Sequence, residues 1–295
     1  MTAQLGTVTV LGTGVLGSQI AYQSAYCGYS VTAYDVDDAA LGVGRERITG
    51  LAERYEREVD GAAGGAGGAA DAALARIRYT SDLPDAARDA DLVIEAIPEI
   101  LDLKREVFAK LGAVAPERTI FATNSSTFLP SALADSTVRP DRFLALHFAN
   151  EIWSHNIAEV MGHAGTDPAV YAAVVDFARS IGMEPIELKK EQPGYVLNTL
   201  TVPFLFAALG LLVDDVAEPE MVDKTWRISV SAPQGPFQMM DVIGLRTVYN
   251  IAAASADERM QAAAALLKER YIDRGKLGRE SGEGFYTYPA AVSAG

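Results

Sequence analysis

The sequence predicts an α/β protein in which a Rossmann-type, mostly parallel sheet domain is followed by an all-helical C-terminal domain. Three observations support this prediction. Short β-branched and apolar runs alternate with helical patterns through the first 190 residues, as in parallel sheets built from βαβ units. A glycine-rich turn, Gly12–Gly17, follows the first of these runs. After Lys190 the strand-like runs stop while helical patterns continue. We therefore expect a first domain at residues 1–190 and a second at residues 191–295.

The elements of the first domain alternate in a regular order. Thr7–Leu11 and Ser30–Tyr34 have the composition of strands and enclose a helical pattern at residues 15–27, which together make a βαβ unit of about thirty residues. A charged helix is expected at Asp37–Glu58, followed by a glycine-rich loop at Gly61–Gly68. Further elements are expected as strands at Asp91–Ala96, Thr119–Thr123, Phe143–Phe148, Ile157–Met161 and Pro185–Leu188, and as a helix at Pro168–Ile181.

The second domain is predicted to consist of helices alone. The expected helices are Tyr195–Val213, Glu218–Ser229, Leu245–Ala254 and Asp257–Asp273. The apolar run Val196–Val213 contains Asn198 and Pro203, which fits a buried helix better than a membrane span. A small domain with this much apolar surface is poorly covered alone, so we expect a homodimer formed through it.

Composition narrows the range of partners and compartments. The net charge of −14 argues against nucleic acid or a membrane as the partner, because both bind positive protein surfaces. The single cysteine, Cys27, excludes an intramolecular disulfide and offers no metal cluster. Its place in an apolar helical pattern indicates a core residue. The N-terminal residues show no basic-then-apolar leader, so we expect a cytoplasmic protein.

The glycine-rich turn predicts a dinucleotide site. Gly12, Gly14 and Gly17 form a G-x-G-x-x-G pattern between a strand and a helix, where the glycines permit a tight turn, close approach of a pyrophosphate and close helix–strand packing. Asp35 ends the second strand, where a carboxylate binds ribose hydroxyls and repels a 2′-phosphate. NAD is therefore favoured over NADP. The cofactor-binding residues expected here are Gly12, Gly14, Val15, Leu16, Gly17 and Asp35.

His147 is a candidate general base. It lies at the end of a predicted strand, and ligands of doubly wound sheets bind at the carboxyl ends of strands. Glu159 follows in the next predicted strand. If the two strands are neighbours, its carboxylate can hold the imidazole and fix its tautomer. A buried core histidine without a chemical role is the alternative. His155 and His163 lack such a setting, although His155 could line the cleft.

Several motifs in register resemble the short-chain 3-hydroxyacyl-CoA dehydrogenases, with the 3-hydroxybutyryl-CoA enzymes as the nearest type. The motifs are NSST (Asn124–Thr127), RFLALHFAN (Arg142–Asn150), IAEV (Ile157–Val160), QPGYVLN (Gln192–Asn198), GPFQMMD (Gly235–Asp241) and GEGFY (Gly282–Tyr286). The resemblance implies NAD-dependent oxidation of a short-chain 3-hydroxyacyl-CoA to the corresponding 3-ketoacyl-CoA.

The resemblance also implies a role for individual residues. His147 would be the base and Glu159 its orienting carboxylate, while Ser126 and Asn198 would contact the substrate. The cofactor site would be completed by Glu99, Lys104, Asn124 and Asn150. From the residues alone, ordinary structural roles remain open: Ser126 as a helix N-cap, Asn198 as a helix hydrogen-bonder, and Glu99 and Lys104 as solvated charges.

The sequence departs from the family's pattern at two places, which leaves the substrate open. The family usually has proline after HF-x-N and a Met-Lys pair before the glutamate, whereas this chain has HFANEIWSHNIAEV. The arm that offers serine and lysine to coenzyme A in the family contains no lysine from Asp35 to Gly61. Its arginines, which can bind phosphate instead, are Arg45, Arg47, Arg54 and Arg57.

Two alternatives to the acyl-CoA substrate therefore stand. One is a dehydrogenase of a free hydroxy acid or sugar acid, of the gulonate dehydrogenase type. The other is a non-catalytic NAD-binding protein, like relatives found in the lens. HFAN favours the acyl-CoA branch over the first, and the paired His147 and Glu159 argue against the second.

Overall fold

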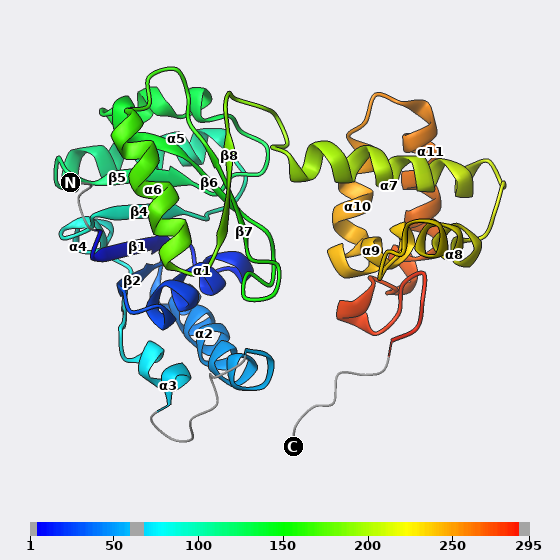
Figure 1. The fold of residues 1–295 in the computed structure, drawn as a ribbon, viewed down its shortest axis with the longest axis horizontal. Coiled ribbons are helices and arrows are strands. Elements are labelled where there is room, and N and C mark those ends of the chain that lie inside the picture. Colours follow the sequence, from blue (N-terminus) through cyan, green and yellow to red (C-terminus); the bar gives the residue numbers. More distant parts are fainter. Residues whose placement is uncertain (1–4, 60–67, 289–295) are drawn as a thin grey trace. The chain divides into compact units, whose positions relative to one another are not determined.

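The computed structural model describes residues 5–59 and 68–288, and their elements are drawn in Figure 1. The chain divides into two compact units between Val196 and Leu197. The first contains one mostly parallel sheet with helices, and the second is helical. The predicted fold class is confirmed. The predicted boundary, between residues 190 and 191, lies six residues before the division between the compact units.

An eight-stranded sheet with the order β3-β2-β1-β4-β5-β6-β7-β8 forms the first unit. Neighbouring strands are parallel except for the antiparallel pair β6–β7. Because β2 and β4 flank β1, the strand order reverses at β1, the position where doubly wound sheets bind ligands. The strands are β1 (Thr7–Leu11), β2 (Ser30–Tyr34), β3 (Ile77–Thr80), β4 (Leu92–Glu95), β5 (Ile120–Thr123), β6 (Phe143–Phe148), β7 (Ile157–Met161) and β8 (Glu184–Leu188).

Six α-helices lie in the described part of this unit. They are α1 (Val15–Tyr26), α2 (Asp38–Glu58), α3 (Ala69–Leu74), α4 (Leu83–Ala87), α5 (Leu101–Val114) and α6 (Pro168–Ser180). The charged helix α2 begins after Asp37, whose side chain accepts a hydrogen bond from the Ala40 N–H and so caps it. Residues 61–67 of the predicted glycine-rich loop lie outside the described residues. The short 3₁₀ segments are Pro130–Ala132, Ala134–Thr137 and Pro140–Arg142.

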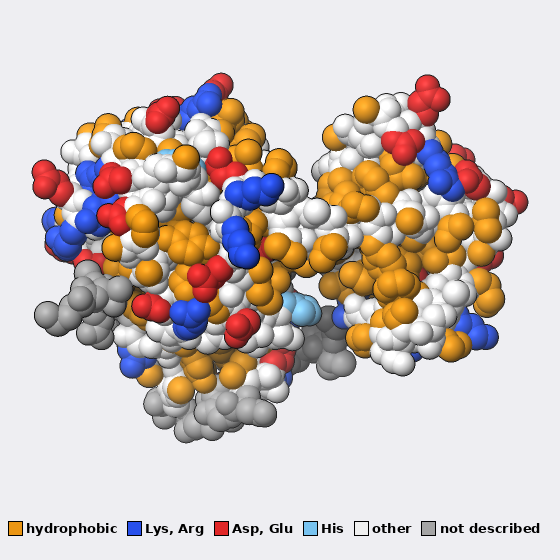
Figure 2. All heavy atoms as spheres, turned by 45° about the horizontal axis from the view of Figure 1, so that its top comes forward, with side chains coloured by type: hydrophobic (Ala, Val, Ile, Leu, Met, Phe, Trp, Pro, Cys, Tyr) orange, Lys and Arg blue, Asp and Glu red, His pale blue; other side chains and the backbone are white. Residues whose placement is uncertain are grey.

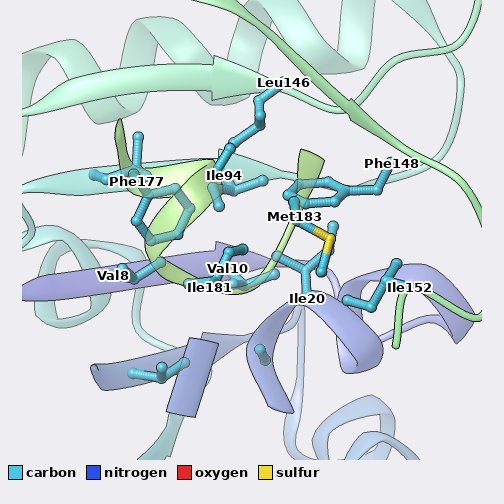
Figure 3. Close-up of a cluster of buried hydrophobic side chains, with 14 of the residues drawn as sticks. Val8, Val10, Ile20, Ile94, Leu146, Phe148, Ile152, Phe177, Ile181 and Met183 are labelled. Atoms are coloured by element: carbon cyan, nitrogen blue, oxygen red, sulfur yellow. The ribbon is translucent and has the colours of Figure 1, made fainter. Parts of the chain in front are cut away.

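Both faces of the sheet are covered, as the alternation of side chains along the strands requires. Val8, Val10 and Ile94 point to one face, which packs against α1, α2, α3 and α6. Figure 3 shows this cluster, in which Ile20 of α1 and Phe177 of α6 meet the strand residues. Leu11, Val93 and Phe121 point to the opposite face and pack with α4 and α5. Because helices cover both faces, a ligand site is expected at the carboxyl ends of the strands.

The second unit surrounds its own apolar core. Its helices are α7 (Leu197–Val213), α8 (Pro219–Val230), α9 (Pro236–Ile243), α10 (Leu245–Ala253) and α11 (Glu258–Arg270), with 3₁₀ segments at Ile272–Arg274 and Arg279–Ser281. Leu209, Phe237 and Leu267 belong to this core. None of the helices in the described ranges has the length and apolar character needed to cross a membrane.

Two buried aspartates account for the motifs GPFQMMD and GEGFY. The Asp223 carboxylate accepts hydrogen bonds from the Phe237 and Gln238 N–H groups at the start of α9. Asp241 accepts hydrogen bonds from the N–H groups of Phe285 and Tyr286. These bonds join the last described segment to α9. Both motifs therefore have a structural role within the helical unit.

Three sequence expectations need correction. Cys27 was expected in the core, but it is exposed, because α1 ends at Tyr26 and Cys27 is its C-cap. Strand β3 was not predicted: it is short, and only Ile77 among its side chains is buried. Helix α9 was also missed. It has eight residues and begins with proline, which shortens the periodic pattern on which a prediction depends.

Candidate active site

The turn after β1 is tight because of two glycines. Gly12 has φ +92°, a conformation that other residues rarely adopt. A Cβ on Gly12 would lie 2.7 Å from the Ala96 carbonyl oxygen. A Cβ on Gly17 would overlap the Gly12 carbonyl oxygen, so helix α1 packs closely on the turn. These are the roles predicted from the sequence for the first and third glycines.

The N-terminus of α1 offers a cradle for an anion. Gly14 is the N-cap and, in the described structure, no side-chain hydrogen bond caps the helix there. Its added Cβ would meet no described atom within 4 Å, so a ligand can approach the backbone closely. The first N–H groups of a helix have no partners inside the helix, and they favour a phosphate. These residues fit the pyrophosphate of a dinucleotide.

A pocket of about 210 Å³ opens at this cradle. Its lining residues are Gly14, Val15, Leu16, Gly17, Ala96, Ile97, Glu99, Lys104, Asn124 and Ser126. They come from the ends of β1, β4 and β5 and the starts of α1 and α5, at the point where the strand order reverses. The structure therefore gathers here most of the residues that the sequence assigned to cofactor and substrate.

Asp35 follows β2 and is fixed by its neighbours. Its Oδ2 atom accepts hydrogen bonds from the Thr13 N–H at 2.8 Å and from the Thr13 hydroxyl at 2.6 Å. Its Oδ1 atom accepts one from the Val36 N–H at 2.8 Å. The carboxylate thus has a fixed orientation beside the glycine-rich turn. In this position it suits a ribose diol and opposes a 2′-phosphate.

His147 and Glu159 form a buried pair. They are directly opposite in the antiparallel register of β6 and β7, which places their side chains on the same face of the sheet. The Nδ1 atom of His147 lies 2.9 Å from Oε2 of Glu159. Both side chains are buried. The prediction that the strands of His147 and Glu159 are neighbours is therefore confirmed.

Ser126 connects this pair to the pocket. Its hydroxyl lies 3.0 Å from Nε2 of His147, and Ser126 also lines the pocket. Ser126, His147 and Glu159 thus form one hydrogen-bonded chain from the pocket into the sheet. A hydroxyl or carbonyl oxygen held beside Ser126 would reach the imidazole, the arrangement that general acid–base catalysis requires.

Two residues outside the predicted site also contact the hydrogen-bonded series Ser126–His147–Glu159. The Tyr195 ring stacks on the His147 ring, with centroids 4.4 Å apart and planes 13° from parallel. Its hydroxyl donates a hydrogen bond of 2.7 Å to the Ser125 carbonyl. The Val196 N–H donates one of 2.8 Å to Oε1 of Glu159. Both residues lie in the quoted motif QPGYVLN, which was the available signal.

Lys104 and Glu99 belong to a second network at the pocket. The Lys104 ammonium is buried and lies 2.5 Å from Oε1 of Glu95 and 3.1 Å from Oε2 of Glu99. Oε1 of Glu99 accepts hydrogen bonds from the hydroxyls of Ser125 and Thr127. The loop that carries Ser126 is therefore anchored to Glu99. Lys104 was expected as a solvated or cofactor-lining charge, and it lines the pocket while paired with two carboxylates.

The pKa values of Glu95 and Glu99 are shifted in opposite directions. Burial raises the pKa of Glu95, and Lys104 offsets this only in part. Burial also opposes ionisation of Glu99, but the hydroxyls of Ser125 and Thr127 and the Lys104 ammonium lower its pKa below the usual value. Glu99 therefore remains a carboxylate at the rim of the pocket.

The other asparagines and histidines differ in their surroundings. Asn124 supports the site, because its side chain accepts a hydrogen bond from the Phe148 N–H next to His147. Asn150 is exposed and lies outside the pocket lining; its backbone carbonyl contacts the His155 ring. His163 contacts the Pro140 carbonyl in a turn. Asn198 lies in the first turn of α7, in the helical unit.

The fold and this site define an oxidoreductase with an NAD-binding domain. The model of the family described as "3-hydroxyacyl-CoA dehydrogenase, NAD binding domain" matches residues 7–192. The corresponding C-terminal domain matches residues 194–288. The chain belongs to the 3-hydroxyacyl-CoA dehydrogenase family, and the predicted cofactor, NAD, is confirmed.

Relatives of known structure or sequence cover almost the whole chain. The solved structure of a diketoreductase, whose description names the dual catalysis of dicarbonyl compounds, is 60% identical to this chain. The match covers 97% of this chain and 100% of the diketoreductase chain, with a TM-score of 0.93. The 3-hydroxybutyryl-CoA dehydrogenase of Mycobacterium tuberculosis is 34% identical over 98% of this chain and 100% of its own. The structure of (S)-3-hydroxybutyryl-CoA dehydrogenase from Ralstonia eutropha is 30% identical, covers 97% of this chain and 99% of its own, and gives a TM-score of 0.81.

Proposed function

We propose that this chain interconverts a 3-hydroxy group and a 3-oxo group on the carbon β to an acyl carbonyl, with His147 as the general acid–base. The observation that carries the proposal is the hydrogen-bonded series Ser126–His147–Glu159, which begins at the cofactor pocket. NAD, when bound, supplies the acceptor of the hydride. The protein's own residues remove the proton and return it.

In the proposed mechanism each group has one task. With its Nδ1 proton donated to Glu159, the neutral imidazole presents the lone pair of Nε2 toward the pocket. Nε2 takes the hydroxyl proton as the carbon loses hydride, and it returns the proton in the reverse direction. The Ser126 hydroxyl donates a hydrogen bond to the same substrate oxygen. The Glu159 carboxylate, held by the Val196 N–H, stabilises the imidazolium that forms.

The substrate class follows from what the relatives share. A 3-ketoacyl thioester contains two carbonyls in a 1,3 relationship, so it is itself a dicarbonyl compound. The acyl-CoA in the name of the 3-hydroxybutyryl-CoA dehydrogenases and the dicarbonyl compounds in the description of the 60% identical diketoreductase can therefore offer the same reacting group. A short 3-hydroxyacyl-CoA is the first candidate. A dicarbonyl compound without coenzyme A is the second.

Three of the four arginines of α2 are engaged within the protein, which favours the second candidate. Arg45 lies over the Tyr79 ring at 4.4 Å, and Arg47 donates a hydrogen bond to the Thr13 carbonyl. Arg54 forms ion pairs with Glu58 and with a glutamate of the loop after β6. Side chains that are already engaged within the protein bind an added phosphate less well. The interaction expected to replace the family's lysine is weakened accordingly.

One assay series separates the candidates. NADH consumption is measured with acetoacetyl-CoA, ethyl acetoacetate, acetylacetone and free acetoacetate, with a keto sugar acid as the alternative from the sequence. Preference for ethyl acetoacetate or acetylacetone over acetoacetyl-CoA supports the second candidate, and the reverse order supports the first. His147→Asn must abolish turnover in either case. A wild-type protein that binds NADH but reduces none of these compounds contradicts the proposal.

We also propose that the helical unit forms a homodimer. Figure 2 shows apolar side chains gathered on its surface. On α8, Met221 is 52% exposed, Ile228 71% and Val230 51%, more apolar surface than a monomer normally leaves to water. Ile228→Glu should convert a dimer, measured by light scattering after gel filtration, into a monomer. A wild-type monomer at micromolar concentration contradicts this proposal.

A further inference from the structure

We propose that Tyr195 is a positioning residue of the catalytic pair, holding the His147 imidazole by its ring and the Ser126 loop by its hydroxyl. The inference rests on the proposed function and deepens it. It assigns a role to a residue of the sheet unit that lies two positions before the helical unit begins.

The ring contact restricts His147 on one face. The two rings are nearly parallel, with centroids 4.4 Å apart, a stacked geometry that favours one orientation of each ring. The Tyr195 side chain is buried, with 1% of the residue exposed. Glu159 fixes Nδ1 and Ser126 faces Nε2. The tyrosine therefore restrains the remaining freedom, rotation of the imidazole out of the plane that contains both partners.

The hydroxyl contact restrains the substrate-facing serine. It donates to the Ser125 carbonyl at 2.7 Å, and that carbonyl belongs to the peptide bond that leads into Ser126. Burial raises the pKa of Tyr195, so the phenol remains a donor. Ser125 is fixed from its other side, because its hydroxyl donates to Glu99. The backbone before Ser126 is thus held both by its carbonyl and by its side chain.

The backbone around Tyr195 is arranged for this placement. Gly194 has φ +76° and Tyr195 φ +54°, so two successive residues occupy the left-handed region. Such a conformation is costly for a residue with a large side chain and persists only where surrounding contacts impose it. The following N–H, from Val196, donates to Glu159. Two successive residues therefore contact both members of the catalytic pair.

An electrostatic consequence follows from the stacking. The face of an aromatic ring carries negative potential and stabilises a neighbouring cation. The groups against the His147 ring from the three elements around it are the Glu159 carboxylate on β7, the Ser126 hydroxyl after β5 and the Tyr195 ring before α7. The carboxylate and the ring both stabilise the imidazolium that forms when Nε2 takes the substrate proton. Loss of the ring should therefore slow proton transfer and lower kcat in the oxidation direction.

The test compares Tyr195→Phe with Tyr195→Leu. The phenylalanine variant keeps the ring and loses one neutral hydrogen bond, so kcat should fall about 2- to 10-fold with an unchanged pH profile. The leucine variant loses both contacts, so kcat should fall about 10- to 100-fold. The difference between the two losses measures the contribution of the Tyr195 ring. KM for NAD should change less than kcat in both variants.

Tyr171→Phe is the matched control. Tyr171 also buries much of its ring in the same unit, and its hydroxyl also donates to backbone carbonyls, those of Val160 and Leu188. This variant should lose stability but keep the wild-type kcat and pH profile. A loss of kcat equal to that of Tyr195→Phe would mean that any buried tyrosine hydroxyl has this effect, and the proposal would be wrong.

A second readout does not depend on turnover. The ring of His147 is followed by nuclear magnetic resonance at neutral pH in the full chain labelled at its three histidines, with His147→Asn to identify the signal. Tyr195→Leu should shift the signal of the His147 ring, because the stacked ring is lost, and Tyr195→Phe should leave it in place. An unchanged signal in a folded Tyr195→Leu protein overturns the positioning role. Failure of the assay series on the wild type would instead overturn only the proposed reaction.

Discussion

Glu159 lies directly opposite His147 in the antiparallel pair β6–β7, and its Oε2 atom is 2.9 Å from the imidazole Nδ1. The register of the two strands is sufficient to bring these side chains to the same face. The second carboxylate oxygen accepts a hydrogen bond from the Val196 N–H, so both oxygens are engaged. The carboxylate therefore has one orientation, which fixes the tautomer of the imidazole.

Glu159→Gln should preserve the fold and greatly reduce turnover. The amide is similar in size but carries no charge to stabilise the imidazolium, and it can present an N–H to Nδ1. We expect kcat to fall about 10²- to 10⁴-fold, as in other histidine–carboxylate pairs, with little change in NADH affinity. Stopped-flow reduction and fluorescence titration measure the two quantities. Glu187→Gln, at an exposed glutamate of β8, is the control, and wild-type turnover in Glu159→Gln would remove the carboxylate from the mechanism.

Ser126→Ala should have a smaller effect than the change at Glu159. The variant loses one hydrogen bond to the substrate oxygen, which develops charge during the reaction. Such a bond contributes about 1.5–3 kcal/mol, so kcat/KM should fall roughly 10- to 100-fold. The matched control is Ser180→Ala, whose hydroxyl contacts Tyr29 and the Phe177 carbonyl away from the pocket. If the two alanine variants have equal kcat/KM, Ser126 does not contact the reacting oxygen.

Seven of the eight strands and the glycine-rich turn could be predicted because their signals are local. The strand Thr7–Leu11 and the helix after Gly14 each depend on a few adjacent residues. Cys27 was wrongly placed because burial depends on where α1 ends, and the apolar pattern continues past that end.

The surroundings of the catalytic pair required the tertiary structure. A twelve-residue separation brings Glu159 to His147 only if β6 and β7 are antiparallel in this register. The contact of Tyr195 with His147 joins residues with no periodic relation in the sequence. The position of Glu95 in the sequence could have indicated a buried ion pair. It is a carboxylate within an apolar strand, and a buried charge of this kind needs a partner, here Lys104.

Glu95→Gln should therefore destabilise the protein through the partner it leaves behind. The Lys104 ammonium is 1% exposed, and it then keeps only the more distant carboxylate of Glu99, so the variant should lose about 1–3 kcal/mol of stability. The double variant Glu95→Gln with Lys104→Met should be more stable than Glu95→Gln alone, because it leaves no buried charge. Urea unfolding of the two single variants and the double variant measures the coupling. Additive effects would show that the pair does not act as a unit. The exposed pair of Glu106 and Lys110 provides the control.

Asp91 should make the stability of the sheet unit depend on pH. Burial opposes its ionisation, but the N–H groups of Gly6 and Thr7 and the Arg118 guanidinium outweigh this and lower the pKa of Asp91 below its usual value. A carboxylate with a lowered pKa stabilises the folded state at pH values above its unfolded pKa, about 3.9. That stabilisation is lost as pH falls through the folded pKa. The bonds from the Gly6 and Thr7 N–H groups join the start of β1 to Asp91, the residue before β4.

Asp91→Asn isolates this contribution. At pH 7 the variant should be less stable by about 1–3 kcal/mol, because it loses the charge-assisted bonds. The difference from wild type should stay constant down to about pH 5 and shrink below about pH 4. Urea unfolding between pH 3 and pH 7 gives both curves. Asp89→Asn, at a side chain that is 76% exposed, should run parallel to wild type throughout. A difference between Asp91→Asn and wild type that grows as the pH falls would reverse the sign of the argument and refute it.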